Sequence, residues 1–119
     1  MAFCCRDLFQ LKHFSKAKVL AGENGLNNEI SLPYVRNTES ISKWLYGREL
    51  LFVTYESNKN SSDDIILLLE ECIEKRLSGV VILIDDKDIK SIPNKIIDRA
   101  NEENLPIFIM PWDIKIIDI

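Results

Sequence analysis

The second half of the chain contains three short apolar runs with almost no polar residue inside them. They cover residues 50–54, 80–84 and 107–110, and their starts lie about 30 residues apart, the length of a strand, a crossover helix and two loops. A strand that is apolar on both sides is covered on both faces, as in a parallel sheet flanked by helices. The pattern therefore predicts three parallel, buried strands.

The segments around these runs have periodicities of their own. Apolar positions at helical spacing predict helices over residues 61–77 and 93–104, the first followed by Gly79 and the second ending near Asn104. Residues 6–13 predict a short amphipathic helix. Extended runs at 19–20 and 30–35 predict two further strands, and Pro33 favours an edge position for the second. We therefore expect an α/β fold with a mostly parallel sheet of four or five strands and helices on both faces, in Rossmann-like layers.

Composition narrows the class of protein. The 119 residues are 46% hydrophobic and 29% charged, with a net charge of −4, which is typical of one globular domain. There is no apolar stretch of the roughly 20 residues that a membrane span needs, and charged residues interrupt the N-terminus early. The densest basic patch, Lys12, Lys16 and Lys18, is small for a nucleic-acid-binding face. We expect a cytoplasmic chain without direct contact to DNA or membrane.

The residues that usually carry catalysis or bind metals are few and scattered. The chain has three cysteines, Cys4, Cys5 and Cys72, and this odd number with uneven spacing indicates reduced thiols. The single histidine, His13, has no candidate catalytic partner nearby in the sequence. The acidic run that starts at Asp85 is interleaved with lysines and reads as a solvated loop. The sequence therefore predicts no catalytic residue, no metal site and no cofactor.

In open parallel sheets, ligands bind outside the carboxyl ends of the strands. Polar and aromatic residues follow the predicted strands at these ends: Arg36, Asn37, Thr54, Tyr55, Asp85, Asp86 and Trp112. This set offers a cation, an amide, hydroxyls, carboxylates and aromatic faces, which suffices to bind a small polar molecule. The alternative interpretation is that these residues only cap the strands and turn the chain.

Seven short motifs, in order along the chain, resemble one known family. They are Leu20-Ala21-Gly22 with Gly25-Leu26, Trp44–Leu50, Leu51–Thr54, Leu77–Val81, Ile92-Pro93, Ala100–Pro106 and Met110–Asp113. Together they resemble the N-terminal domain of purine catabolism regulatory (PucR-like) transcription factors. The likeness covers nearly the whole chain.

The resemblance implies a function. Residues 1–119 would form one regulatory domain, part of a longer bacterial transcriptional regulator whose helix-turn-helix lies in a C-terminal part not contained in this chain. Where the family often has Gly-Gly before Glu-Leu, this chain has Gly47-Arg48, and Val53-Thr54-Tyr55 replaces a run of two threonines and a glycine. If this loop contacts a ligand, Arg48 and Tyr55 would narrow or re-specify the pocket.

Three functions remain open at this point. The domain could sense a small-molecule effector, using the polar strand ends. It could instead, or in addition, form homo-oligomers through the apolar segment Trp112–Ile119 and the set Phe3, Phe9 and Phe14. A small α/β enzyme is the third alternative, and the missing nucleophile–base pair and cofactor motif argue against it.

Overall fold

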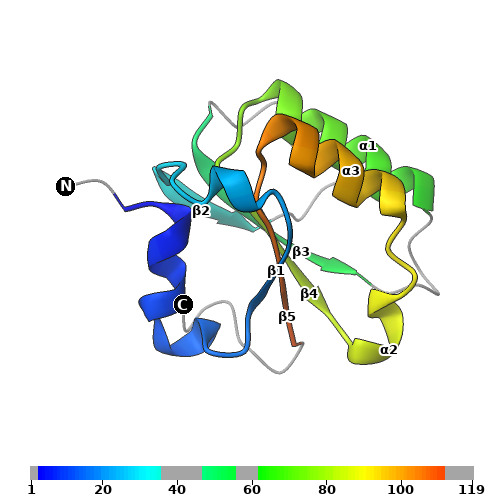
Figure 1. Cartoon of the computed structure of the whole chain (residues 1–119), viewed down its shortest axis with the longest axis horizontal. Helices are drawn as coiled ribbons and strands as arrows, with labels where there is room; N and C mark the ends of the chain where they lie inside the picture. Colours follow the sequence, from blue (N-terminus) through cyan, green and yellow to red (C-terminus); the bar gives the residue numbers. More distant parts are fainter. Residues whose placement is uncertain (1–2, 36–46, 56–61, 112–119) are drawn as a thin grey trace.

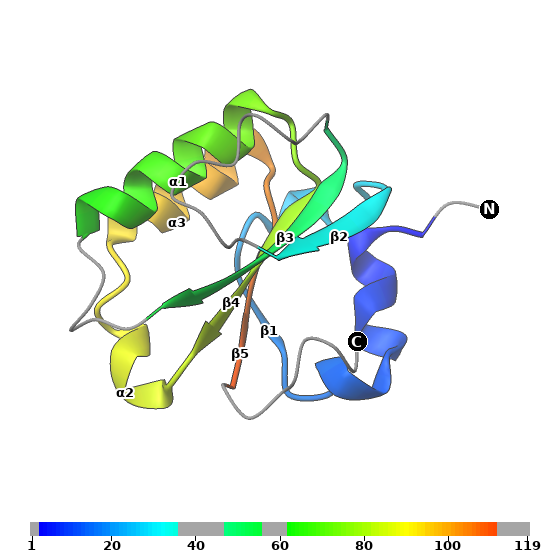
Figure 2. The same ribbon diagram turned by 180° about the vertical axis from the view of Figure 1, so that it is seen from behind.

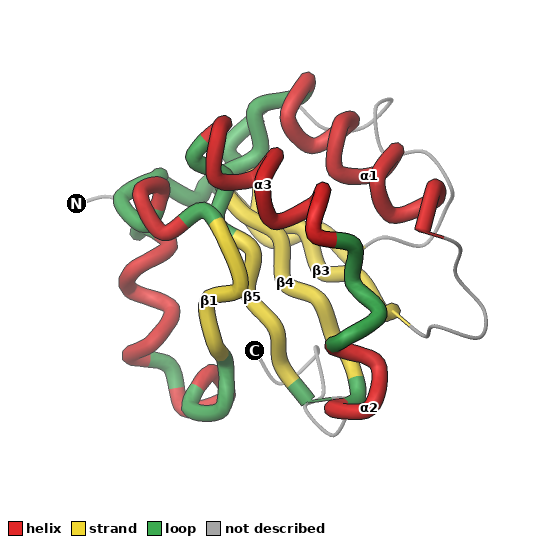
Figure 3. The backbone as a smooth tube through the Cα atoms, turned by 45° about the vertical axis from the view of Figure 1, so that its right-hand side comes forward, coloured by secondary structure: helices red, strands yellow, loops and turns green. Residues whose placement is uncertain are grey.

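The computed structural model describes residues 3–35, 47–55 and 62–111, which form a five-stranded sheet with helices on both faces. The strands lie in the order β1-β5-β4-β3-β2, and Figure 3 shows β1, β5, β4 and β3 side by side. Their bounds are β1 Lys18–Ala21, β2 Leu32–Val35, β3 Glu49–Tyr55, β4 Gly79–Ile84 and β5 Ile107–Met110. The three predicted buried strands are β3, β4 and β5, and the two predicted shorter strands form the edges.

The α/β class is confirmed, and the sheet is mixed. Strands β2 to β5 run parallel, whereas β1 pairs antiparallel with β5. Ala21, the last residue of β1, lies opposite Ile107, the first of β5, so β1 ends where the parallel strands begin. We call this side of the sheet the amino edge and the opposite side the carboxyl edge. Residues 22–31 connect β1 to β2 along the amino edge, so no crossover helix is needed there.

Helices of different kinds cover the two faces. The helices α1, Ser62–Glu74, and α3, Asn94–Glu103, lie side by side on one face (Figures 1 and 2), and the short α2, Asp86–Ile89, precedes α3. The other face carries two 3₁₀ helices, η1 Cys5–Gln10 and η2 Lys12–Phe14. Leu11 is extended between them, so the predicted single helix over residues 6–13 is interrupted.

The central strands are buried on both sides because their side chains alternate between two hydrophobic clusters. All six residues of β4 are buried. Val80, Ile82 and Ile84 pack under α1 and α3, whereas Val81 and Leu83 pack under η1 and η2. This alternation explains why the runs in the sequence are continuously apolar.

The C-terminus of α1 is set by a residue in the left-handed conformation. Arg76 has a φ of 57°, its N–H donates to the carbonyl of Ile73, and the N–H of Leu77 donates to the carbonyl of Cys72. This pair of bonds is a Schellman motif. The helix is therefore shorter than the predicted 61–77, and Arg76, instead of Gly79 beyond the predicted end, holds the left-handed conformation. Gly79 begins β4, where an added Cβ would lie 3.2 Å from Cys5 Sγ.

The helix α3 ends in the same way, and here the sequence prediction is confirmed. Asn104 has a φ of 54° and donates its N–H to the carbonyl of Asn101, while the N–H of Leu105 donates to the carbonyl of Ala100. Asparagine tolerates this conformation better than most residues. Both helices therefore deliver a buried leucine, Leu77 or Leu105, shortly before the next strand.

The connection 22–31 approaches the end of α3 so closely that two positions admit no side chain. A Cβ at Gly22 would lie 1.9 Å from the Leu105 carbonyl oxygen, and one at Gly25 would lie 1.9 Å from that of Asn104. Gly22 also has a φ of 72°, and its N–H donates to Asn101 Oδ1 at 2.7 Å. These contacts fasten the connection to the amino edge.

Replacing Gly25 with alanine tests this close approach. The φ of Gly25 is not in the left-handed region, so the penalty is steric, and we expect Gly25→Ala to lower the free energy of unfolding by about 1–3 kcal/mol. Asn24, the exposed residue before Gly25, provides the control. Asn24→Ala should change the free energy of unfolding by less than about 0.5 kcal/mol. Urea unfolding of both variants measures the difference, and equal midpoints would contradict the proposed packing.

Candidate functional site

Three of the residues predicted to form a site lie at the surface of the carboxyl edge. Thr54 is exposed near the end of β3, and Asp85 and Asp86 are exposed at the start of α2. Thr54 pairs with Leu83 in the parallel register of β3 and β4, which brings it to the same edge as Asp85. The expectation of a shared edge is thus met for these residues, and ligand binding there stays a prediction.

The remaining predicted site residues differ in their placement. Tyr55 is buried, and its hydroxyl accepts a hydrogen bond from Ser91 Oγ at 3.2 Å and donates to the Ser91 carbonyl at 3.4 Å. It therefore ties β3 to the segment before α3 rather than facing an open rim. Arg36, Asn37 and Trp112 lie outside the described residues. A hollow at this edge, lined in part by Asp86, measures only about 40 Å³.

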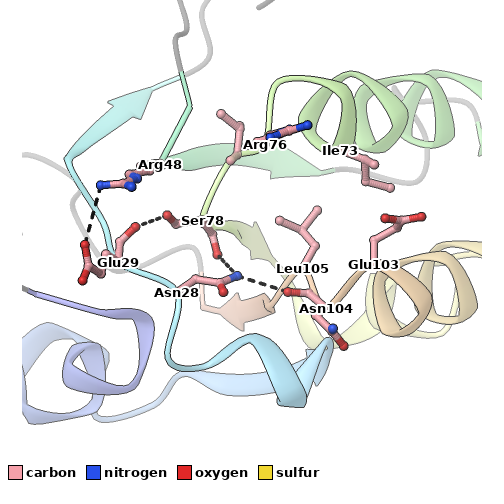
Figure 4. A pocket seen from close by; sticks show the side chains of 10 residues that line it. Asn28, Glu29, Arg48, Ile73, Arg76, Ser78, Glu103, Asn104 and Leu105 are labelled. Atoms are coloured by element: carbon pink, nitrogen blue, oxygen red, sulfur yellow. Dashed lines mark hydrogen bonds and ion pairs between the residues drawn. The ribbon is translucent and has the colours of Figure 1, made fainter.

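A much larger cavity, of about 540 Å³, opens at the amino edge (Figure 4). Small-molecule sites commonly measure roughly 300–1,000 Å³. The lining comes from the connection 22–31, from the residue before β3 and from the ends of α1 and α3. It consists of Asn28, Glu29, Arg48, Ile73, Arg76, Leu77, Ser78, Glu103, Asn104 and Leu105.

The backbone around this cavity contains unusual conformations. Among the described residues, the non-glycine residues with a positive φ are Arg48, Arg76 and Asn104, and all three line the cavity. Each lies shortly before one of the parallel strands β3, β4 and β5. A left-handed conformation costs a non-glycine residue roughly 1 kcal/mol or more, and such costs cluster at functional sites.

A network of hydrogen bonds builds one wall of the cavity from distant parts of the chain. Asn28 Nδ2 donates to the carbonyls of Ser78, at 3.3 Å, and Asn104, at 3.1 Å (Figure 4). The Ser78 hydroxyl donates to the Glu29 carbonyl, and the buried Cys5 thiol donates to the Ser78 carbonyl at 3.2 Å. The connection 22–31 is thus bonded to the starts of two strands.

The cavity contains charges of both signs. Arg48 lies 3.7 Å from the Glu29 carboxylate, and both side chains are more than half exposed. Glu103 accepts a hydrogen bond of 2.8 Å from Arg99, whose bonds to Glu70 and then to Glu103 raise the pKa of its guanidinium. Among the described residues, the Arg76 side chain has neither an ion pair nor a hydrogen bond.

The described lining contains the kinds of group that bind small polar molecules. It supplies guanidinium, carboxylate and amide groups beside the apolar side chains of Ile73, Leu77 and Leu105. The lining contains neither histidine nor cysteine, and the Ser78 hydroxyl is bonded to a carbonyl instead of a base. The described ranges also contain no group of three or more His, Cys, Asp or Glu side chains arranged to hold a metal ion.

The residues predicted from the sequence lie at the edge of the sheet opposite this cavity, and ligand binding there stays a prediction. The rule for parallel sheets directs attention to the carboxyl ends, whereas this cavity exists because residues 22–31 cross the amino ends. Two signals were present in the sequence. Gly22 and Gly25 indicate a closely packed turn, and Arg48 occupies a position where the resemblance described above predicts glycine. Arg48 lines this cavity, whereas Tyr55 is not among its described lining residues. That either residue narrows a ligand pocket stays a prediction.

The fold is that of a small α/β domain with a largely polar cavity at the amino edge of its sheet. The model of the purine catabolism regulatory protein-like family matches residues 7–119, and the chain belongs to this family. The resemblance predicted from the seven motifs is thereby confirmed. None of the described helices is both long and apolar enough to cross a membrane.

One relative carries the name of the family. The purine catabolism regulatory protein of Bacillus subtilis (strain 168) is 25% identical over 113 residues, which cover 95% of this chain and 21% of that protein. The chain therefore spans about a fifth of the length of this relative.

The buried thiol beside the cavity makes a testable contribution to stability. Burial, with a smaller effect of neighbouring Cys4, raises the pKa of the Cys5 thiol from 9.0 to about 12. Between these values the folded protein holds a proton that the unfolded chain has lost. The free energy of unfolding should therefore fall as the pH rises, approaching about 1.4 kcal/mol per pH unit.

Urea unfolding from about pH 8 to about pH 11 measures this slope, with a variant as its control. Cys5→Ala should lower stability at every pH because it removes a buried group, yet it should lose the part of the slope that the thiol contributes. Identical slopes for the variant and the natural chain would show that Cys5 does not titrate in this way.

Proposed function

We propose that this chain is a regulatory module of a bacterial transcriptional regulator and that it binds a small-molecule effector in the amino-edge cavity. The cavity carries this proposal, because it combines a suitable volume with a few polar groups and an apolar wall. Membership in the family supports the regulatory role. In this proposal the DNA-binding helix-turn-helix belongs to another part of a longer, cytoplasmic protein.

The position of the cavity suits the task of a sensor. Its lining comes from residues 28–29, 48, 73–78 and 103–105, which are far apart in the sequence. A ligand that touches several of these segments stabilises their arrangement by RT ln(1 + [L]/Kd). Such differential stabilisation is what couples binding to a conformational equilibrium. The polar rim at the carboxyl edge, with Thr54, Asp85 and Asp86, is the alternative location.

A thermal-shift screen followed by mapping of the bound position tests the proposal. The panel contains purine catabolites, since the Bacillus relative is named for purine catabolism, together with amino acids and organic acids. We expect at least one compound to raise the melting temperature in a saturable manner. In amide NMR spectra, that compound should shift Ser78 and Leu105.

The same spectra include a control site. Shifts confined to Thr54 and Asp85 would move the effector site to the carboxyl edge and contradict the cavity. A complete absence of stabilising compounds across all classes would contradict effector binding by this domain.

Self-association is a second candidate function, supported by two exposed aromatic side chains. Phe3 and Phe9 are each 41% exposed, and the Phe9 ring packs edge-to-face on Phe108 at 5.7 Å. Phe14, which was expected to share this role, is instead buried against Phe52. The segment Trp112–Ile119 lies outside the described residues. A partner could therefore cover the η1 side of the domain.

Sedimentation equilibrium with Phe9→Ser tests this candidate. If η1 lies in a dimer interface, the variant should raise the dimer dissociation constant at least tenfold, about 1.4 kcal/mol, because an exposed aromatic side chain is lost from the contact. Leu67→Ser is the matched control, since Leu67 is 64% exposed on α1, on the other face of the sheet. A natural chain that stays monomeric at all concentrations would contradict this role.

A further inference from the structure

We propose that the amino-edge cavity takes a small organic carboxylate and that Arg76 and Arg48 hold its anionic group. This inference rests on the proposed function, because it assumes that the cavity is the effector site. It adds the chemical class of the ligand and the residues that select it.

The first argument concerns the backbone positions of the two arginines. Arg48 and Arg76 both adopt the left-handed conformation, which glycine would occupy at lower cost. The Arg48 N–H donates to the Arg76 carbonyl at 3.0 Å, so the two side chains start from adjacent backbone positions. Both line the same cavity. Strained backbone positions cluster at functional sites, so long cationic side chains on two such positions in the lining of one cavity indicate a function for those side chains.

The second argument concerns which charges are free to meet a ligand. The Arg76 guanidinium has no ion pair or hydrogen bond within the described part of the chain. Arg48 turns toward Glu29 at one end of the cavity (Figure 4), but the separation is 3.7 Å and both side chains are largely exposed. Such surface pairs are weak. The carboxylate of a ligand can therefore displace the Glu29 carboxylate from Arg48.

The second carboxylate in the cavity lining, that of Glu103, is paired with an arginine that does not belong to the described lining. Glu103, at the other end of the cavity in Figure 4, is bonded to Arg99 at 2.8 Å. The C-terminal carbonyls of α1 and α3 accept hydrogen bonds from their own Schellman motifs. These bonds reduce the repulsion that an anion would meet at the helix ends.

The surroundings favour an organic carboxylate over inorganic phosphate. Phosphate sites typically use the N-termini of helices, and this cavity faces the C-terminal ends of α1 and α3. Ile73, Leu77 and Leu105 add an apolar wall that a bare anion cannot use. The planar guanidinium fork binds a carboxylate group through two parallel hydrogen bonds, so either arginine can hold the anionic end of a ligand whose carbon skeleton meets the apolar wall.

The experiment compares matched probes by calorimetry and thermal shift at low salt. The probes are benzoate and succinate, their neutral amides benzamide and succinamide, and inorganic phosphate. We expect at least one carboxylate to bind the natural chain in a saturable manner, while its amide and phosphate do not. Amide NMR shifts at Ser78 and Leu105 confirm the position.

Three substitutions in the cavity and one control separate binding from folding. Arg76→Gly should weaken carboxylate binding at least tenfold while keeping or raising the melting temperature, because glycine relieves the left-handed strain. Arg48→Gly should likewise weaken carboxylate binding and keep or raise the melting temperature. Glu29→Gln should tighten binding several-fold, because it releases Arg48. Lys95→Gln removes one charge from an exposed position at the start of α3 and should leave binding unchanged.

Each alternative outcome has a distinct meaning. Carboxylate binding that survives Arg76→Gly, or that falls equally with Lys95→Gln, would overturn the assignment in favour of non-specific attraction. If inorganic phosphate bound as tightly as the carboxylate probes, the assignment of an organic carboxylate as the ligand would be overturned. A neutral or cationic compound that shifts Ser78 and Leu105, with no carboxylate doing so, would overturn the ligand class and leave the effector site standing. The absence of any binder in both panels would contradict both proposals.

Discussion

The attachment of residues 22–31 to the amino edge of the sheet is the contact on which the rest of this structure depends. Backbone meets backbone there, because Gly22 and Gly25 lie against the carbonyls of Leu105 and Asn104 with no room for a Cβ. This attachment allows β1 to pair at one edge and β2 at the other without a crossover helix. It also places Asn28 and Glu29 over the starts of β4 and β3, and so creates the cavity.

The amino edge of the sheet also contains three non-glycine residues in the energetically costly left-handed conformation. Two helices end there in Schellman motifs, and the left-handed positions are filled by Arg76 and Asn104 instead of glycine, while Arg48 holds a similar conformation before β3. Asparagine suits such a position through its short polar side chain, whereas arginine has no comparable local advantage. A stability argument alone favours glycine at both arginine positions. Both side chains line the cavity, which is why the proposed ligand site is built on them.

The two faces of the sheet are protected unequally. The long helices α1 and α3 cover one face, joined by the Arg99–Glu70 ion pair at 2.7 Å, whereas two short 3₁₀ helices cover the other. Phe9 accordingly stays 41% exposed although its ring contacts Phe108. Effector binding at the amino edge and association through the η1 side would use separate surfaces, so a longer regulator could use both.

The sequence by itself determined the buried strands, the two long helices and the family, because continuous apolar runs have one stable place in a domain and helical periodicity is a local property. It also identified Asn104 as the end of α3, since the conformational preference of asparagine is local. The tertiary structure alone decided the antiparallel direction of β1, the left-handed conformations of Arg48 and Arg76, and the cavity itself. These features arise where residues near positions 28, 48, 76 and 104 meet, and no local pattern records which distant backbones will lie within hydrogen-bond distance of one another.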